Sequence, residues 1–202
     1  MSNRRTGIGE VLALADELGV LRVRDLMSRG IHHEHLRRLC QQGKMERVSR
    51  GLYRLRDADV TEHATLVTVS KRFPKGVICL LTALRFHGIG TQSPREVWMA
   101  LRRGSAIPRN VNIPVRFMLF SEASFDAGVE EHVLENVRVR ITTPAKTVAD
   151  CFKYRNKVGL DVALEALREA VRHRKCTTDD LWQHAKVCRV TNVMRPYLEA
   201  TL

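Results

Sequence analysis

The stretch VLRVRDLMSRGIHHEHLRRLCQQGKMERVSRGLYRLR, residues 20–56, decides the fold of the N-terminal part of the chain. Near its start, Val23, Leu26 and Met27 recur at the i, i+3, i+4 spacing of a helix that buries one apolar stripe. Gly30 follows, and glycine adopts the left-handed conformation that ends helices at little cost. The segment therefore predicts a short helix that is closed by a tight turn.

A second short helix is predicted over about residues 32–42. Leu36, Leu39 and Cys40 would form its buried side, and Gly43 would end it. The remaining faces carry imidazole, basic and amide side chains: His32, His33, His35, Arg37, Arg38, Gln41 and Gln42. This helix therefore presents hydrogen-bond donors over most of its exposed surface.

A basic hairpin is predicted between Lys44 and Arg56, with its turn at Ser49-Arg50-Gly51. We call residues 44–56 the wing. Helix, turn, helix and basic hairpin is the order of a winged helix-turn-helix, whose second helix can lie in the major groove of DNA. A further helix over residues 8–18 would support this domain from its N-terminal side.

The side chains on the second helix and the wing are typical of a DNA-binding surface. Glu34 is the only acidic residue between residues 26 and 45. Arginine makes the commonest specific base contact, to guanine, and glutamine suits adenine, whereas basic groups on a wing would neutralise phosphates. The residues predicted to bind DNA are His32, His33, His35, Arg37, Arg38, Gln41, Lys44, Arg47 and Arg50. A winged helix that serves only as a protein-docking module is the alternative.

The net charge of +12 and the pI of about 10.1 favour a polyanionic partner. The excess is +4 over residues 1–60 and +8 over residues 61–202, so it is not confined to the predicted winged helix. The second part of the chain either follows a phosphate backbone as well or uses its charge for solubility.

Cysteine usage and hydropathy predict a cytoplasmic protein. The sequence has no apolar run of about 18 residues that could span a membrane, and its N-terminus lacks the apolar stretch of a signal peptide. The five cysteines are odd in number and most lie in apolar helical patterns, which indicates reduced core residues instead of a disulfide framework.

After a polar junction at Asp57-Ala58-Asp59, residues 61–202 predict a separate α+β domain. We expect a small, mostly antiparallel sheet and several helices, and thus two domains, 1–58 and 61–202. The first two expected helices cover 62–73 and 77–87. A third begins at Pro144 after the cap Thr143, a fourth covers about 160–171, and a fifth begins near Thr177. The expected strands cover 97–101, 115–120 and 132–142, the last as a hairpin that turns at Glu135-Asn136.

The sequence contains no persuasive catalytic constellation. His173, Cys176, His184 and Cys188 have a spacing related to that of zinc ligands, but they lack a Gly-rich knuckle or a second Cys-x2-Cys. Asp150, beside Lys146 and Lys153 on a helix, is expected to form a routine surface ion pair. We therefore predict no catalytic residue, no metal ligand and no cofactor.

Four blocks of the sequence resemble the AbiEi family, the antitoxins of type IV, abortive-infection toxin–antitoxin systems. They are RVSRGLYRLR (47–56), ICLLTALRFHGIGTQSP (78–94), TTPAKTVADCFKYRNKVGLDVALEALREAV (142–171) and VMRPYLEA (193–200). The resemblance implies a repressor that binds its own promoter, expected to contain inverted repeats, and that counters a nucleotidyltransferase-like toxin. It also implies that residues 1–58 read the operator and that the remainder is the antitoxin domain.

Two alternatives remain beside this leading hypothesis of a non-enzymatic antitoxin. One is a plain winged-helix transcriptional regulator with a ligand- or protein-sensing C-terminal domain. The other is a nucleic-acid-modifying enzyme, for which Glu130-Glu131-His132 is the only candidate cluster. A gene for a nucleotidyltransferase next to this one would be expected only under the leading hypothesis.

Overall fold

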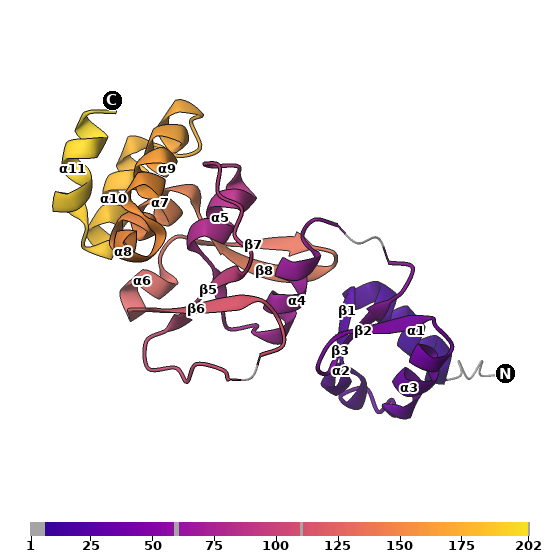
Figure 1. Cartoon of the computed structure of the whole chain (residues 1–202). Helices are drawn as coiled ribbons and strands as arrows, with labels where there is room; N and C mark the ends of the chain where they lie inside the picture. Colours follow the sequence, from indigo (N-terminus) through magenta and orange to yellow (C-terminus); the bar gives the residue numbers. More distant parts are fainter. Residues whose placement is uncertain (1–6, 59–60, 110, 202) are drawn as a thin grey trace. The chain divides into compact units, whose positions relative to one another are not determined.

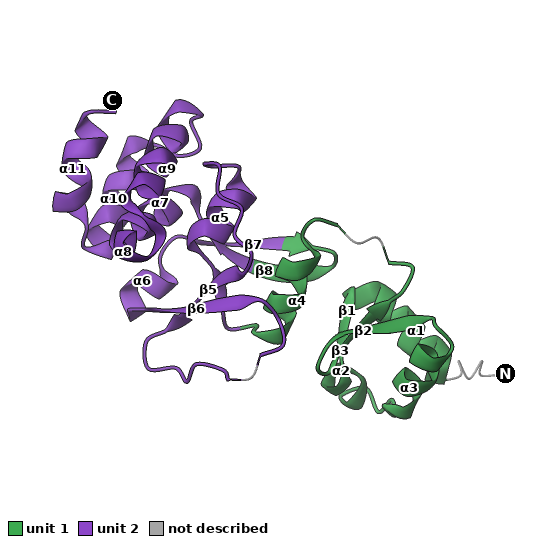
Figure 2. Cartoon of the chain, viewed as in Figure 1, with its two compact units in different colours: residues 1–74, 133–139 green, residues 75–132, 140–202 purple. Residues whose placement is uncertain are grey.

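A computed structural model of the chain describes residues 7–58, 61–109 and 111–201. The chain divides into two compact units (Figure 2). Unit 1 comprises residues 1–74 together with 133–139, and unit 2 comprises residues 75–132 and 140–202. The boundary thus falls after the first helix of the expected second domain, and the functional division near residues 58–61 stays a prediction.

The first part of unit 1 has the order of elements of a winged helix (Figure 1). The elements are α1 (Gly7–Leu18), β1 (Val20–Arg22), α2 (Val23–Met27), α3 (Glu34–Gln41), β2 (Met45–Ser49) and β3 (Leu52–Leu55). The strands form an antiparallel sheet in the order β1-β3-β2. Gly51, at φ +74°, provides the left-handed conformation that the turn of the wing requires. The predicted winged helix-turn-helix is therefore confirmed, with β1 as an element that the sequence pattern did not predict.

The core of the winged helix forms where the three helices meet β1 and β2. Leu21, Leu26 and Leu39 are completely buried there. Met27, which was expected on the same stripe as Leu26, has 66% of its surface exposed. The prediction for Met27 was wrong because α2 ends at this residue, so the helix is too short to bury a full stripe.

Unit 1 also contains α4 (Ala64–Arg72) and the adjoining ends of two strands, residues 133–139. The expected helix over 62–73 is thus confirmed to within two residues, and Pro74 follows it. The turn between the two strands lies at Glu135 and Asn136, whose φ angles are +46° and +60°. Positive φ at both central residues is typical of a tight hairpin turn, so the predicted turn is confirmed.

The remaining elements complete the expected α+β fold. They are β4 (Val77–Ile78), α5 (Leu80–His87), β5 (Val97–Arg102), β6 (Val115–Phe120), α6 (Glu122–Asp126), β7 (Val129–Leu134), β8 (Val137–Thr142), α7 (Pro144–Lys153), α8 (Arg155–Val158), α9 (Leu160–Arg172), α10 (Thr178–Cys188) and α11 (Thr191–Glu199). None of the helices in the described part of the chain has the length and apolar character to cross a membrane.

The second sheet has five strands in the order β6-β5-β4-β8-β7 and is mixed, not mostly antiparallel as expected. Strands β4 and β5 pair antiparallel, whereas β4 pairs with β8 and β5 pairs with β6 in parallel. Parallel neighbours are separated by long crossovers, so a strand pattern read along the sequence does not reveal their direction.

The run that begins at Val77 was expected to be helical throughout, but Val77 and Ile78 form β4. Ile78 pairs with Met99 on one side and with Ile141 on the other. A short apolar run is compatible with a buried strand or a buried helix, and the sheet pairing decides in favour of the strand here. Cys79 is extended, and α5 begins after it.

The core of unit 2 is built around α7, whose residues from Ala145 to Phe152 are all buried. Thr143 caps this helix by accepting a hydrogen bond from the backbone N–H of Lys146, and Pro144 occupies the first helical position. The helices α5, α9, α10 and α11 pack against α7. The helix is therefore central to unit 2, and its charged residues Lys146 and Asp150 are buried, whereas Lys153 at its last position is exposed.

Candidate nucleic-acid interface

The burial of Leu36 and Leu39 in the winged-helix core fixes which face of α3 is exposed. The predicted DNA-binding residues on this helix, on the two residues before it and on the wing are exposed with the exception of His35. The exposed ones are His32, His33, Arg37, Arg38, Gln41, Lys44, Arg47 and Arg50. The side chains of His32 and His33 stack with their ring centroids 4.6 Å apart.

His35 instead packs between α3 and α1. It is half-buried, and a Cβ atom added to Gly7 would lie only 2.5 Å from its Nε2 atom. Only glycine at position 7 leaves room for this ring at the start of α1. His35 therefore holds two helices together, and we leave it out of the proposed DNA contacts.

Arg37 is held by Glu34, one turn earlier on α3. The Arg37 Nε atom donates a hydrogen bond of 2.9 Å to Glu34 Oε1, and a second guanidinium nitrogen lies 2.7 Å from the same oxygen. The hydrogen bond from Arg37 lowers the pKa of Glu34. Because both groups are exposed to solvent, the pair orients the guanidinium more than it stabilises the fold. This pair was not among the predictions, although the i, i+3 spacing of Glu34 and Arg37 could have indicated it.

A groove of about 570 Å³ lies between α3 and the wing. Val23, Leu36, Cys40 and Tyr53 contribute apolar lining, and His33, Glu34, Arg37, Gln41 and Arg47 contribute polar groups. Arg47 is held in place by a hydrogen bond of 3.2 Å from its Nε atom to the Ser49 carbonyl oxygen. The fold thus brings predicted residues of the helix and of the wing to one groove.

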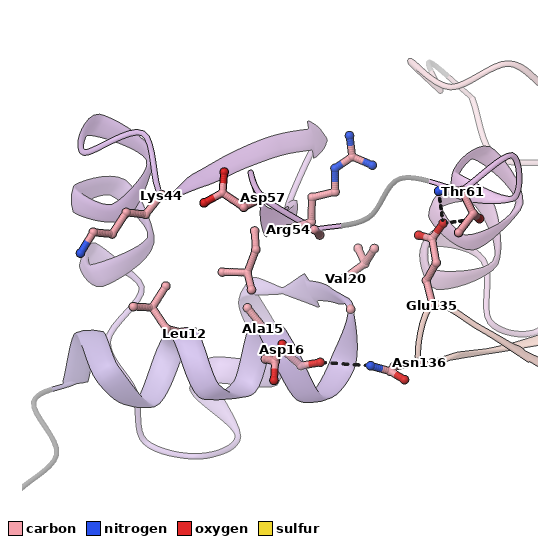
Figure 3. Close-up of a pocket in the computed structure, with 13 residues that line it drawn as sticks. Leu12, Ala15, Asp16, Val20, Lys44, Arg54, Asp57, Thr61, Glu135 and Asn136 are labelled. Carbon is pink, nitrogen blue, oxygen red and sulfur yellow. Dashed lines mark hydrogen bonds between the residues drawn. The ribbon is translucent and has the colours of Figure 1, made fainter.

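A second contact region of unit 1 joins α1 to the β7–β8 turn (Figure 3). Asn136 Nδ2 donates to the Asp16 carbonyl oxygen at 3.1 Å. Glu135 Oε1 accepts hydrogen bonds from the backbone N–H and the hydroxyl group of Thr61, at 3.1 and 2.6 Å. A Cβ atom on Gly19 would overlap the Glu135 carbonyl oxygen, so the turn can approach only because residue 19 is glycine. A cavity of about 700 Å³ adjoins these residues.

The ion pair expected on the surface of unit 2 is completely buried, so that prediction was wrong. Lys146 Nζ lies 2.6 and 2.5 Å from the two carboxylate oxygens of Asp150, and neither side chain is exposed. Cys188 Sγ donates to Asp150 Oδ1 at 3.3 Å. Burial raises the pKa of Asp150, and the charge of Lys146 opposes that rise. The pair lies in the core because α7 is covered by other helices.

The residues with zinc-like spacing do not assemble into a metal site. Cys188 contacts Asp150, and His184 lies against Gly128 and Lys146. Burial raises the pKa of Cys176 to about 11 and that of Cys188 to about 12, so both thiols are protonated at neutral pH. Within the described residues, no group of three or more His, Cys, Asp or Glu side chains could hold a metal ion.

Glu130, Glu131 and His132, the candidate cluster of the enzyme hypothesis, lie along β7. Glu130 and Glu131 are exposed, and His132 Nε2 is 3.4 Å from Glu130 Oε2. The ring of His132 packs against Phe86, with the centroids 4.9 Å apart. Glu130 and Glu131 thus lie on the surface of the strand, and His132 makes a packing contact.

These features define the class of the N-terminal part, a winged helix with a basic exposed helix and wing. Residues 10–56 match the family described as "Transcriptional regulator, AbiEi antitoxin". The match covers nearly all of the winged helix and confirms the family resemblance there, including the block at residues 47–56, whereas the other three blocks lie outside the matched residues. No match to a curated protein was found.

The fold of the chain is also found in a solved structure. The crystal structure of the RV2827C protein from Mycobacterium tuberculosis aligns with a TM-score of 0.61 over 96% of this chain and 80% of that one. The two sequences are 13% identical, so the likeness concerns the fold alone.

Proposed function

We propose that this chain is a type IV antitoxin that represses its own operon by binding promoter DNA and that counters a nucleotidyltransferase-like toxin. The observation that carries the proposal is the groove between α3 and the wing, where Arg37, Gln41 and Arg47 lie together in a domain that matches AbiEi regulators. Neutralisation of the toxin needs no catalysis by this chain under the proposal.

The proposed roles divide between the helix and the wing. On α3, Arg37, Arg38 and Gln41 read base edges in the major groove, and the two imidazoles of His32 and His33 flank the start of the helix. On the wing, the basic side chains of Lys44, Arg47 and Arg50 contact phosphates and position the helix without reading sequence.

We further propose that the antitoxin function belongs to residues 61–202, whose core is built around α7. Coexpression of this fragment with the toxin encoded beside it, scored by growth, tests the division. Growth is expected to be restored by the fragment and by the full chain alike. If a soluble and folded fragment leaves the cells unprotected, the winged helix takes part in neutralisation and the division is wrong.

The alternative function is that of a plain regulator with a sensing domain. The cavity of about 700 Å³ beside the β7–β8 turn favours it, because a ligand there would touch both α1 and residues that follow the wing. The same coexpression separates the two functions. A plain regulator would bind its promoter but would not restore growth in the presence of any neighbouring toxin.

A further inference from the structure

A small cavity of about 220 Å³ lies in unit 1, beside the turn of the wing. We call it the basic pocket. Four cationic side chains line it, together with apolar residues and the wing glycine. Its lining is Arg22, Val23, Arg24, Gly51, Leu52, Lys71, Arg72 and Pro74. Two of the cations come from the junction of β1 and α2, and two come from the last turn of α4.

The carboxylate of Asp25 neutralises only part of this cluster. Its Oδ2 atom accepts a hydrogen bond of 2.9 Å from the backbone N–H of Arg22 and forms an ion pair with Lys71, whose Nζ atom is 3.8 Å away. One negative charge thus faces four positive ones. Arg72 uses one guanidinium nitrogen to donate to the carbonyl oxygen of Arg50, at 3.3 Å.

Two of the cations are also poorly solvated. The side chain of Lys71 is only 13% exposed. Burial lowers the pKa of Lys71, the Asp25 carboxylate opposes that shift, and the positive charges of Arg24 and Arg29 add to it. The Nε atom of Arg22 is buried and has no hydrogen-bond partner. A buried donor without a partner costs free energy, which an acceptor in the cavity would recover.

We propose that the basic pocket is an oxyanion site that takes one phosphate group. Guanidinium and ammonium groups are typical phosphate-binding groups in proteins, and here they approach from three elements, β1, α2 and α4. The volume of the basic pocket is far larger than the roughly 30 Å³ that one water molecule occupies in the liquid. A tetrahedral oxyanion therefore has room in it.

The phosphate can come from the DNA backbone or from a free phosphate compound. The DNA source rests on the proposed function and extends the wing contact, because Gly51 at the turn of the wing borders the pocket. Lys71 and Arg72 would then contact DNA although they lie outside the segment that the sequence assigns to DNA binding.

The test compares the full chain with the double variant Lys71→Gln/Arg72→Gln. The matched control is Lys153→Gln/Lys157→Gln, which loses the same charge from exposed residues that do not line the pocket. Binding of inorganic phosphate is measured by calorimetry at constant ionic strength. The wild type and the control should bind it with similar affinity, and the pocket variant should bind it at least tenfold more weakly.

A second arm measures the affinity for promoter DNA against salt concentration. If the bound phosphate belongs to DNA, the slope of log K against log salt should fall by about 0.9 in the pocket variant, as expected for one lost phosphate contact. If inorganic phosphate binding is lost and the slope is unchanged, the site takes free phosphate compounds, and the oxyanion site stands.

Either of two results overturns the proposal. One is equal phosphate affinity in the pocket variant and the wild type. The other is no phosphate binding by the wild type together with an unchanged salt slope in the pocket variant. Failure of the wild type to bind DNA contradicts the proposed function alone, because the phosphate arm is independent of it. If circular dichroism shows that the double variant is unfolded, Arg24→Gln at the exposed rim replaces it.

Discussion

Lys146 and Asp150 form an ion pair inside unit 2, with Nζ 2.6 and 2.5 Å from the two carboxylate oxygens and no exposure of either side chain. The two residues are one turn apart on α7, a spacing that is usually found on helix surfaces. The burial of the pair therefore results from the helices that cover α7, and each buried charge is compensated by the other.

Removal of one partner should destabilise the protein strongly. Asp150→Ala leaves Lys146 buried without its counter-ion, and the free energy of unfolding should fall by roughly 3–5 kcal/mol. The double variant Lys146→Met/Asp150→Leu should lose much less, because it buries no charge. Urea unfolding followed by circular dichroism measures both. A loss below about 1 kcal/mol in Asp150→Ala would show that the pair is solvated.

The contact of the β7–β8 turn with α1 gives a second prediction. Gly19→Ala should lower the stability for two reasons. Alanine disfavours the left-handed conformation at φ +64°, and its Cβ atom would overlap the Glu135 carbonyl oxygen. Gly51→Ala is the matched control, because φ is +74° there but no atom lies within 4 Å of an added Cβ. The control should lose about 1–2 kcal/mol and Gly19→Ala clearly more. Equal losses in thermal unfolding would mean that the turn does not press on residue 19.

Elements that are determined by residues close together in the sequence could be predicted, whereas elements that depend on distant residues could not. The winged helix could be predicted because Gly43 and Gly51 and the periodicity around Leu36 act within a few residues. Strand β1 was missed because its three residues are too few for a pattern and form a strand only by pairing with β3. The parallel pairing of Ile78 with Ile141 and the burial of Lys146 depend on residues far away in the sequence.

The candidate site could be predicted in residue type but not in detail. The exposed donors of α3 follow from helical periodicity. The packing of His35 against Gly7 and the basic pocket around Lys71 depend on how α1 and α4 lie in unit 1, which the spacing within one helix does not encode.

The basic side chains of the wing should set affinity without setting specificity. The double substitution Arg47→Ala/Arg50→Ala should weaken binding to promoter and unrelated DNA by the same factor. Each lost phosphate contact should reduce the slope of log K against log salt by about 0.9. Fluorescence anisotropy at several salt concentrations measures both quantities. A loss confined to the promoter, with an unchanged slope, would mean that the wing reads bases.

Glu34 should sharpen the discrimination between DNA sequences. Its carboxylate orients Arg37 and repels the phosphate backbone, so Glu34→Gln should bind unrelated DNA more tightly than the wild type does. The ratio of promoter affinity to non-specific affinity should fall by at least threefold, since one oriented base contact contributes about 1–3 kcal/mol of discrimination. An unchanged ratio would mean that Glu34 does not position Arg37 for base recognition.

The most direct test of the proposed function is a gel-shift titration of the full chain on the DNA upstream of its own gene. The wild type should bind this DNA in preference to a scrambled duplex of the same length. Arg37→Ala/Arg38→Ala should lose that preference while its circular dichroism spectrum and its protection against the toxin stay unchanged. Equal affinity of the wild type for both duplexes, or a double variant that still prefers the promoter, would contradict the assignment of α3 as the helix that reads DNA.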